Sequence, residues 1–257
     1  MLVIASWHSG SSAEFMSEKL WFLKSCSILE RLSPSDLAEL EGRARVKKFP
    51  ARSPIYLPAD QSEAVLLLVS GRVKICGFTA DGRQSILAFI EPGELFGELA
   101  MFDAGARQEC AEATEATTVV CIPREALWQI MERHADVTIG ITKLIGLRRR
   151  RIERRLKYLL FRSNRDRMIH LLLELAEQYG IATAEGVKIR IKLSHQDLAN
   201  IIGSTRETVT VVLGELQAER LISVGRRQLV ITNLNKLADG VMVDAPLLPA
   251  VSKDAFK

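Results

Sequence analysis

The residues LSHQDLANIIGSTRETVTVVLGELQAERLI, at 193–222, restrict the fold of this chain more than any other segment. Ser194 and Asp197 have the spacing of a capping box, which satisfies the first free backbone amides of a helix. Gly203 interrupts an apolar run where a tight turn is needed, and the serine–threonine pair after it can cap a second helix. The pattern predicts two short helices across a glycine turn, a helix-turn-helix.

The second predicted helix combines a buried face with a polar N-terminal end. Its valines and leucines recur at helical spacing, whereas Arg206, Glu207 and Thr210 fall on the other side. Such a helix can enter the major groove, where Arg donates two hydrogen bonds to guanine and Glu accepts one from cytosine. Two alternating runs around a GlyArgArg turn predict a wing with a basic tip. These features favour DNA binding over a helix pair that only packs. The candidate DNA-contacting residues are Ser204, Thr205, Arg206, Glu207, Thr210, Val211, Arg226 and Arg227.

The charge is distributed unevenly along the chain. The formal net charge is +4 over 257 residues. Residues 1–147 carry 15 Lys and Arg against 19 Asp and Glu, a balance of −4, and the remaining residues carry 20 against 12, a balance of +8. A basic second half behind an acidic first half indicates that only the second half meets a polyanion.

The first half has the pattern of short antiparallel strands. From Val46 to about Ile122, apolar runs of four to seven residues alternate with turn residues, and AspGly at 81–82 is a hairpin pattern. Many short strands separated by turns predict an antiparallel barrel or jelly roll. SerProSerAsp at 33–36 predicts a helix start that Ser35 can cap, and residues 1–24 read as a flexible tail.

A long helix is predicted after the strands, with Asp136 as a cap and its end near Phe161. Apolar residues recur along one side at a spacing near 3.5, which suits pairing with an identical helix; packing onto its own barrel is the alternative. The run LRRRRIERRLK at 147–157 is the densest positive segment and is either a solvated face or close to phosphates. The candidate pairing residues are Ile141, Ile145, Ile152, Leu156 and Leu159.

Residues 93–109, GELFGELAMFDAGARQE, contain closely spaced glycines that let a backbone approach a partner, and they end near a lone arginine, Arg107. This combination raises the possibility of a pocket for a phosphate-bearing ligand.

Several classes of site are disfavoured by what the sequence contains. No CxxC pair exists, and the four histidines are scattered, so we expect no metal site. Paired catalytic carboxylates and a nucleophile elbow are not visible, so an enzyme has little support. The apolar runs are too short to span a membrane and the N-terminus lacks a signal-peptide pattern, so we expect a cytoplasmic protein. A redox role stays open for Cys26, Cys76, Cys110 or Cys121.

The order of β-roll, long helix and winged helix-turn-helix resembles the Crp/Fnr family of transcriptional regulators, relatives of the cAMP receptor protein. The resemblance rests on LSHQDLANIIGSTRETV, on GELFGE at 93–98 and on SGRVKI…DGR at 70–83. It implies an α+β fold with an N-terminal antiparallel β-roll, which resembles a cyclic-nucleotide-binding jelly roll, and a homodimer joined through the long helix. The two recognition helices would enter successive major grooves of a palindrome, about 34 Å apart. RNA polymerase is the expected protein partner. The implied segments are a tail at 1–24, the β-roll at 25–135, the dimerisation helix at 136–162, the winged helix-turn-helix at 163–240 and a C-terminal tail at 241–257.

The resemblance also assigns individual residues. Arg206 and Glu207 match the family's principal base-reading pair, while Val211 stands where the cAMP receptor protein has a second arginine. In the phosphate–ribose cassette, the Glu of GlyGluLeu binds the ribose and the arginine neutralises the phosphate. This chain keeps those residues but has glutamine, followed by Glu109, in place of the small hydroxyl residue, and the adenine-facing ThrSer pair becomes Ile152–Glu153. The candidate effector residues are Gly97, Glu98, Leu99, Arg107, Gln108, Ile152 and Glu153.

The departures in the cassette leave the effector open. A structural role, with Glu98 bonded to backbone or to Arg107, competes with binding of a nucleotide-type effector, and cAMP itself is disfavoured because Glu109 adds a negative charge. The sequence does not identify a definite cofactor. An alternative function is an effector-binding regulatory module that acts through a protein partner rather than DNA.

Overall fold

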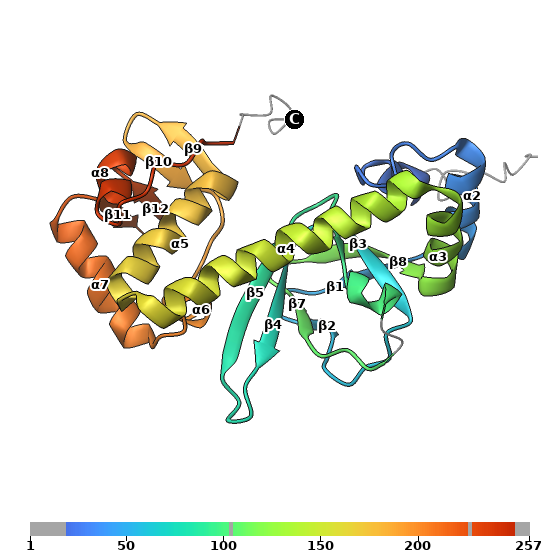
Figure 1. The fold of residues 1–257 in the computed structure, drawn as a ribbon, viewed down its shortest axis with the longest axis horizontal. Coiled ribbons are helices and arrows are strands. Elements are labelled where there is room, and N and C mark those ends of the chain that lie inside the picture. The colour runs from blue at the N-terminus through green and yellow to red at the C-terminus, as the bar shows by residue number, and fades with distance from the viewer. Residues whose placement is uncertain (1–18, 103–104, 226–227, 250–257) are drawn as a thin grey trace, which may run out of the picture. The chain divides into compact units, whose positions relative to one another are not determined.

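The computed structural model describes residues 19–102, 105–225 and 228–249. The chain divides into two compact units, residues 1–149 and 150–257, and helix α4 (Ala135–Phe161) contains residues of both (Figure 1).

The first unit contains two four-stranded antiparallel sheets that enclose an apolar interior. In the first sheet the strand order is β1–β8–β3–β6, and in the second it is β2–β7–β4–β5. Consecutive strands β4 and β5 form a hairpin whose turn contains Gly82 at φ 81°, as the AspGly pattern predicts. The strands are β1 (Arg45–Phe49), β2 (Pro54–Tyr56), β3 (Ala64–Ser70), β4 (Val73–Phe78), β5 (Gln84–Ile90), β6 (Leu95–Phe96), β7 (Cys110–Ala113) and β8 (Thr117–Pro123).

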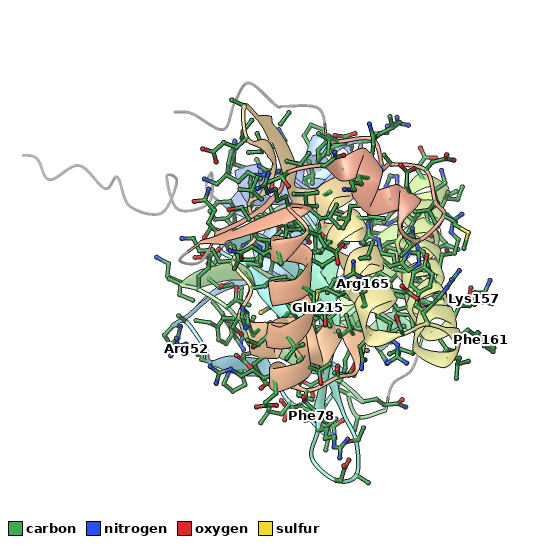
Figure 2. The ribbon with its side chains drawn as sticks, turned by 90° about the vertical axis from the view of Figure 1, so that its left-hand side faces the viewer. Arg52, Phe78, Lys157, Phe161, Arg165 and Glu215 are labelled. Atoms are coloured by element: carbon green, nitrogen blue, oxygen red, sulfur yellow. The ribbon has the colours of Figure 1, made fainter. Side chains whose placement is uncertain are left out.

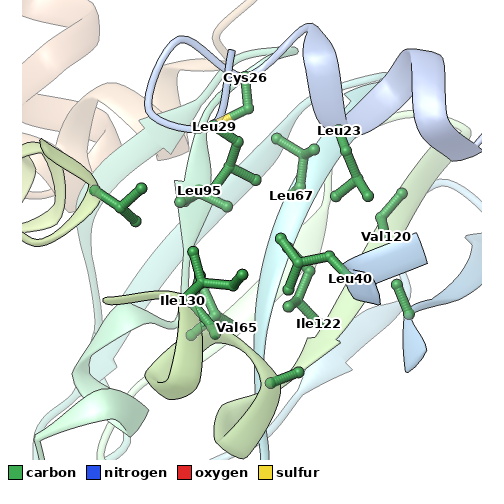
Figure 3. Close-up of a cluster of buried hydrophobic side chains, with 14 of the residues drawn as sticks. Leu23, Cys26, Leu29, Leu40, Val65, Leu67, Leu95, Val120, Ile122 and Ile130 are labelled. Carbon is green, nitrogen blue, oxygen red and sulfur yellow. The ribbon is translucent and has the colours of Figure 1, made fainter. Parts of the chain in front are cut away.

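The strands of the first unit are held by two buried clusters. One lies inside the roll around Phe96 and Leu68; the other lies where the N-terminal segment, two shorter helices and the start of α4 cover the first sheet (Figure 3). The alternation of Leu66 and Leu68 with Val65 and Leu67 sends neighbouring side chains into different clusters, because successive strand residues point to opposite faces. The strand pattern of the sequence therefore encodes both cores.

The flexible tail predicted for residues 1–24 is wrong for its last part. Residues 19–24 are helical, and Phe22 and Leu23 are 8% and 0% exposed in the cluster that covers the first sheet. Burial of these two large side chains, worth about 1.5–3 kcal/mol each, stabilises a segment whose local pattern is weak. Residues 1–18 lie outside the described residues.

Two shorter helices precede the long one. Helix α2 (Pro34–Arg43) is capped by Ser33, two residues before the predicted Ser35, since Ser33 accepts from the amide of Asp36 and Pro34 occupies the first helical position. Helix α3 (Arg124–Arg133) buries Leu127 and Ile130. Helix α4 then begins at Ala135, so Asp136 lies inside the first turn and is not the predicted cap.

The second unit is a winged helix-turn-helix. Its sheet has the order β11–β12–β10–β9, and the helices surround a core formed mainly by α5. Its elements are α5 (Asn164–Tyr179), β9 (Gly180–Thr183), β10 (Gly186–Ile189), α6 (His195–Ile202), α7 (Arg206–Ala218), β11 (Ile222–Gly225), β12 (Gln228–Ile231) and α8 (Leu234–Asp239). Residues 243–249 have neither helix nor strand. The predicted α+β class, with a β-roll, a long helix and a winged helix-turn-helix, is confirmed.

Candidate nucleic-acid interface and sensor cassette

The turn between α6 and α7 is built by local chemistry that the sequence predicts. Ser194 and Asp197 form a capping box in which each side chain bonds the backbone of the other residue. Gly203 has φ 64° and ends α6, a left-handed conformation that favours glycine. Thr205 caps α7 by accepting from the amide of Thr208 at 3.2 Å, so of the two candidate caps it is Thr205, not Ser204, that caps.

The recognition helix α7 has the two faces that were predicted. Its apolar side chains pack inward, while the arginine and glutamate at its start, Arg206 and Glu207, are exposed. The backbone amide of Glu207 and the Thr205 hydroxyl hold the pKa of the Glu207 carboxyl below its usual range, so it is an ionised acceptor at neutral pH. Val211 is 61% exposed. The buried residues are Val209, Val212, Leu213 and Leu216.

The Thr210 hydroxyl is partly engaged within the protein. It donates to the carbonyl of Arg206 at 2.9 Å and lies 2.8 Å from Nδ1 of His195 on α6. This hydrogen bond links the recognition helix to the helix before it. Thr210 therefore has fewer free hydrogen-bonding positions for a base than Arg206 has.

Ion pairs from α5 also support α7. Arg165 on α5 lies 3.5 Å from Glu215 and 2.7 Å from Glu219, and Figure 2 labels the first pair. Exposed pairs of this kind contribute little each, about 0–1 kcal/mol, so the buried apolar face of α7 accounts for most of its packing.

The wing consists of β11 and β12, which pair antiparallel from Ile222–Ile231 to Gly225–Gln228. Arg226 and Arg227 at its tip lie outside the described residues, so their assignment stays a prediction. The structure adds β9, which extends the wing sheet through β10; the sequence pattern does not indicate this strand, because Gly180 reads as a helix end.

The candidate pairing residues of helix α4 differ in burial. Ile141 is fully buried in the core of the first unit and Ile145 is partly buried against it, so Ile141 is not available for a second chain and its assignment is wrong. Further along, Ile152, Leu156 and Leu160 are 45%, 52% and 65% exposed and recur every four residues. Leu159 is half-buried. The exposed apolar stripe therefore begins at Ile152, about three turns after the first predicted pairing residue, and includes Leu160.

The candidate sensor cassette holds Arg107 almost entirely within the protein. Its guanidinium donates to the carbonyl of Ala64 at 2.6 Å and lies 4.0 Å above the ring centre of Tyr56. Gly97, at φ 67°, leaves the space that the guanidinium occupies, since a Cβ there would meet Nη1 at 2.6 Å. The close approach that the glycine pattern predicts is thus made by the protein's own arginine.

Glu98 pairs with an arginine that the sequence analysis did not assign. Its carboxylate accepts from Arg148 of α4 at 2.5 Å, and Arg148 also donates to the carbonyl of Leu95 at 2.6 Å. The predicted structural role, in which Glu98 bonds to backbone or to Arg107, is therefore wrong about its partner. Spacing along the chain gives no indication of a contact between residues 50 positions apart.

Glu109 lies near the cassette, as the sequence predicts. It accepts from the Tyr56 hydroxyl at 2.9 Å, and burial together with Glu98 raises the pKa of its carboxyl, against the lowering effects of the Tyr56 hydrogen bond, Arg148 and Arg107. Two arginines and two carboxylates make the cluster neutral when Glu109 is ionised. A phosphate would therefore find no excess positive charge among these four side chains.

The remaining effector candidates are on the surface. Gln108 and Glu153 are exposed, and Leu99 and Ile152 are 52% and 45% exposed. The assignments of these four residues as effector contacts stay predictions.

The raised pKa of Glu109 has a measurable consequence for stability. A carboxyl whose folded-state pKa is raised favours folding below its unfolded pKa, and this contribution is lost as pH rises through the folded pKa. We therefore expect Glu109→Gln, which keeps an acceptor for Tyr56, to unfold at higher denaturant concentration than the unmodified protein at pH 7. The gain should disappear near pH 4. An equal gain in stability at pH 7 and at pH 4 would contradict a raised pKa of Glu109.

Removing the Arg107 guanidinium should destabilise the first unit. Arg107→Met leaves the Ala64 carbonyl without its donor, which costs about 1–3 kcal/mol of unfolding free energy. Fluorescence of Trp21 and Trp128, both in this unit, reports its urea transition. Arg83→Met is the control, because that side chain is 84% exposed and should cost less than about 0.5 kcal/mol. Equal transitions for the two variants would show that Arg107 has no structural role.

Two families match the two halves of the chain. Residues 46–134 match the cyclic nucleotide-binding domain, and residues 166–239 match the Crp-like helix-turn-helix domain. The chain belongs to the Crp/Fnr family of transcriptional regulators. Crp/Fnr relatives include the CRP-like cAMP-activated global transcriptional regulator of Mycobacterium tuberculosis, which is 26% identical over 84% of this chain and 96% of its own length. The global nitrogen regulator of Synechocystis is 29% identical over 73% of this chain and 84% of its own length.

Two solved structures support the same fold. FixK2 of Bradyrhizobium japonicum aligns with a TM-score of 0.67 at 25% identity, over 80% of this chain and 99% of its own. The c-di-GMP-responsive regulator CLP of Xanthomonas campestris aligns with a TM-score of 0.69 at 22% identity, over 78% of this chain and 100% of its own. At this identity the alignment shows the fold alone. The matched relatives are transcriptional regulators and not enzymes, so this Crp/Fnr protein is a DNA-binding transcriptional regulator.

Other site classes find no place in the described part of the chain. Within residues 19–102, 105–225 and 228–249, no group of His, Cys, Asp and Glu could hold a metal ion, and none of the helices is long and apolar enough to cross a membrane. Burial raises the pKa of the thiols of Cys26, Cys110 and Cys121, which lowers the fraction of reactive thiolate at neutral pH.

Proposed function

We propose that this regulator binds an imperfect palindrome as a homodimer and reads each half-site with the start of α7. The observation that carries the proposal is the polar end of the recognition helix. Arg206 and Glu207 are exposed there, beside a face whose apolar residues are buried. An exposed arginine and an ionised glutamate suit guanine and cytosine edges in the major groove. Val211 can contact a thymine methyl but cannot donate a hydrogen bond to guanine.

The exposed stripe on α4 supports the homodimer. Ile152, Leu156 and Leu160 present apolar side chains at four-residue spacing on a helix of 27 residues. A second copy of the same helix would bury them, and the pair would place two recognition helices about 34 Å apart on one face of DNA. Ser204, Thr205, Arg226 and Arg227 are proposed to contact phosphates and set the register. RNA polymerase is the proposed protein partner at a promoter.

A salt-dependent shift assay tests the dimeric DNA complex. If the two domains contact about 6–10 phosphates, affinity for a palindromic duplex should fall about 10³- to 10⁵-fold between 50 and 200 mM salt. The control duplex has the same half-sites separated by half a helical turn more, which places them on opposite faces of DNA. Equal affinity for both duplexes would contradict a two-fold symmetric complex, and no affinity for either would favour a module that acts through a protein partner.

We also propose that DNA binding needs no added cyclic nucleotide. The cassette supports this because Arg107 is occupied by a carbonyl and an aromatic ring, and Glu98 by Arg148. An effector would have to bind the DNA-competent state more tightly than the other state to change this. Calorimetry with cAMP, cGMP and cyclic dinucleotides should give no saturable heat, and the shift should be unchanged when they are added. A cyclic nucleotide that increases DNA affinity at least tenfold would overturn the proposal.

A further inference from the structure

A cavity of about 210 Å³, open to solvent on one side, lies within the second unit, between the wing and the helix-turn-helix. Its walls come from α5, β10, the start of α6, α7 and the two wing strands, all labelled in Figure 1. We call this space the wing cavity. It is separate from the sensor cassette, which lies in the first unit.

The inner wall of the wing cavity is aliphatic and buried. The five most buried lining residues are each no more than 5% exposed, and none has a polar side-chain atom: Leu175, Ile189, Ile191, Leu198 and Leu213. A water molecule needs two to four polar partners, which this wall does not offer. For comparison, an engineered aliphatic cavity of about 150 Å³ stays dry and binds benzene. The wing cavity is larger, so it has room for a bicyclic aromatic molecule.

The polar lining consists of Ser194, His195 and Gln228. The Thr210 hydroxyl donates its hydrogen to the carbonyl of Arg206, so it must accept from Nδ1 of His195. In the neutral ring the proton therefore lies on Nδ1, and Nε2 is an acceptor. A ligand with one N–H or O–H group would match this acceptor.

We propose that the wing cavity binds a small apolar molecule of about the size of indole that carries one hydrogen-bond donor. The aliphatic wall would bury its ring system, and His195 would accept from its donor. Polar ligands such as nucleotides are excluded by the same wall, because their phosphates would lose hydration without a partner.

An occupant of the wing cavity would contact two elements that face DNA in the proposed complex. Leu213 belongs to the recognition helix, and Leu229 belongs to the wing. Any effect on DNA affinity rests on the proposed function and requires different affinities of the ligand for the free and DNA-bound forms. Binding of the ligand to the wing cavity does not depend on the proposed function.

The test is titration calorimetry of the full chain with indole. We expect one saturable site per chain with a Kd of about 1 mM or lower, and a Kd about two- to tenfold higher for 1-methylindole, which lacks the N–H donor. Absence of saturable indole binding would overturn the proposal. Equal affinity for the two probes would overturn the part assigned to His195.

Filling the cavity locates the site. Leu229→Trp places a large ring on a lining residue that is only half-buried, and it should weaken indole binding at least tenfold. Ile181→Trp is the matched control, because Ile181 is also half-buried on the same sheet but does not line the cavity, and it should leave the Kd within about twofold. Circular dichroism checks that both variants fold, and Val224→Phe replaces Leu229→Trp if that variant does not. Retained binding in the filled variant, or loss in the control, would contradict the assigned site.

Discussion

Replacing Leu156 by aspartate is expected to separate the dimer into monomers and to lower affinity for the palindromic duplex about 10²- to 10⁴-fold. Leu156 is 52% exposed in the centre of the stripe on α4, and two-fold symmetry would bring both copies of the new carboxylate into one interface. The affinity loss follows because two linked recognition helices act at a high effective concentration on adjacent half-sites, and a monomer has only one. Sedimentation and the shift assay measure the two effects separately.

Leu147→Asp is the matched control for this experiment. Leu147 is 49% exposed on the same helix, and nine residues at about 100° each place it on the opposite side from Leu156. The substitution therefore introduces the same charge at nearly the same exposure without touching the stripe. If Leu147→Asp also gave monomers, or if Leu156→Asp stayed dimeric, the stripe would not be the interface.

Arg206→Ala is expected to cost about 1–3 kcal/mol of binding free energy on the specific site and to abolish discrimination at one base pair. The guanidinium is exposed at the first position of α7, and Arg206 contributes to the fold mainly through its backbone carbonyl, which accepts from Thr210. The substitution should therefore leave the melting temperature nearly unchanged. Competition with duplexes that carry each of the four base pairs at the contacted position measures the lost discrimination.

The control for Arg206→Ala is Arg31→Ala, an exposed arginine of the first unit. It removes the same charge and should change specific and random DNA binding by less than about twofold. An equal loss on specific and random DNA for Arg206→Ala would assign Arg206 to a phosphate instead of a base.

The helix-turn-helix could be predicted almost residue by residue because its determinants are local. Ser194, Asp197 and Thr205 act on backbone amides within three residues, and Gly203 adopts a left-handed conformation that L side chains avoid. The buried face of α7 follows from helical periodicity alone. The same holds for the strand hairpin at Gly82. Interactions between residues close together in the chain can therefore be predicted from the sequence.

The sensor cassette and the stripe on α4 could not be predicted in the same way. The sequence indicated a close approach at Gly97 and a charge at Glu109, and both are present. It gave no indication that Arg148 would form an ion pair with Glu98, or that Ile141 would be buried in the core of the first unit. Periodicity identifies an apolar face but not the surface that covers it, since an internal core and a second chain select the same residues.

By itself, the sequence determined the fold class, the helix-turn-helix and the polar end of its second helix, because caps, a glycine turn and hydrophobic spacing act over a few residues. Only the tertiary structure decided which charges pair in the cassette, where the exposed stripe of α4 begins, and that a cavity lies behind the wing. Those properties depend on residues tens of positions apart that meet through packing, and neither spacing nor composition records such contacts.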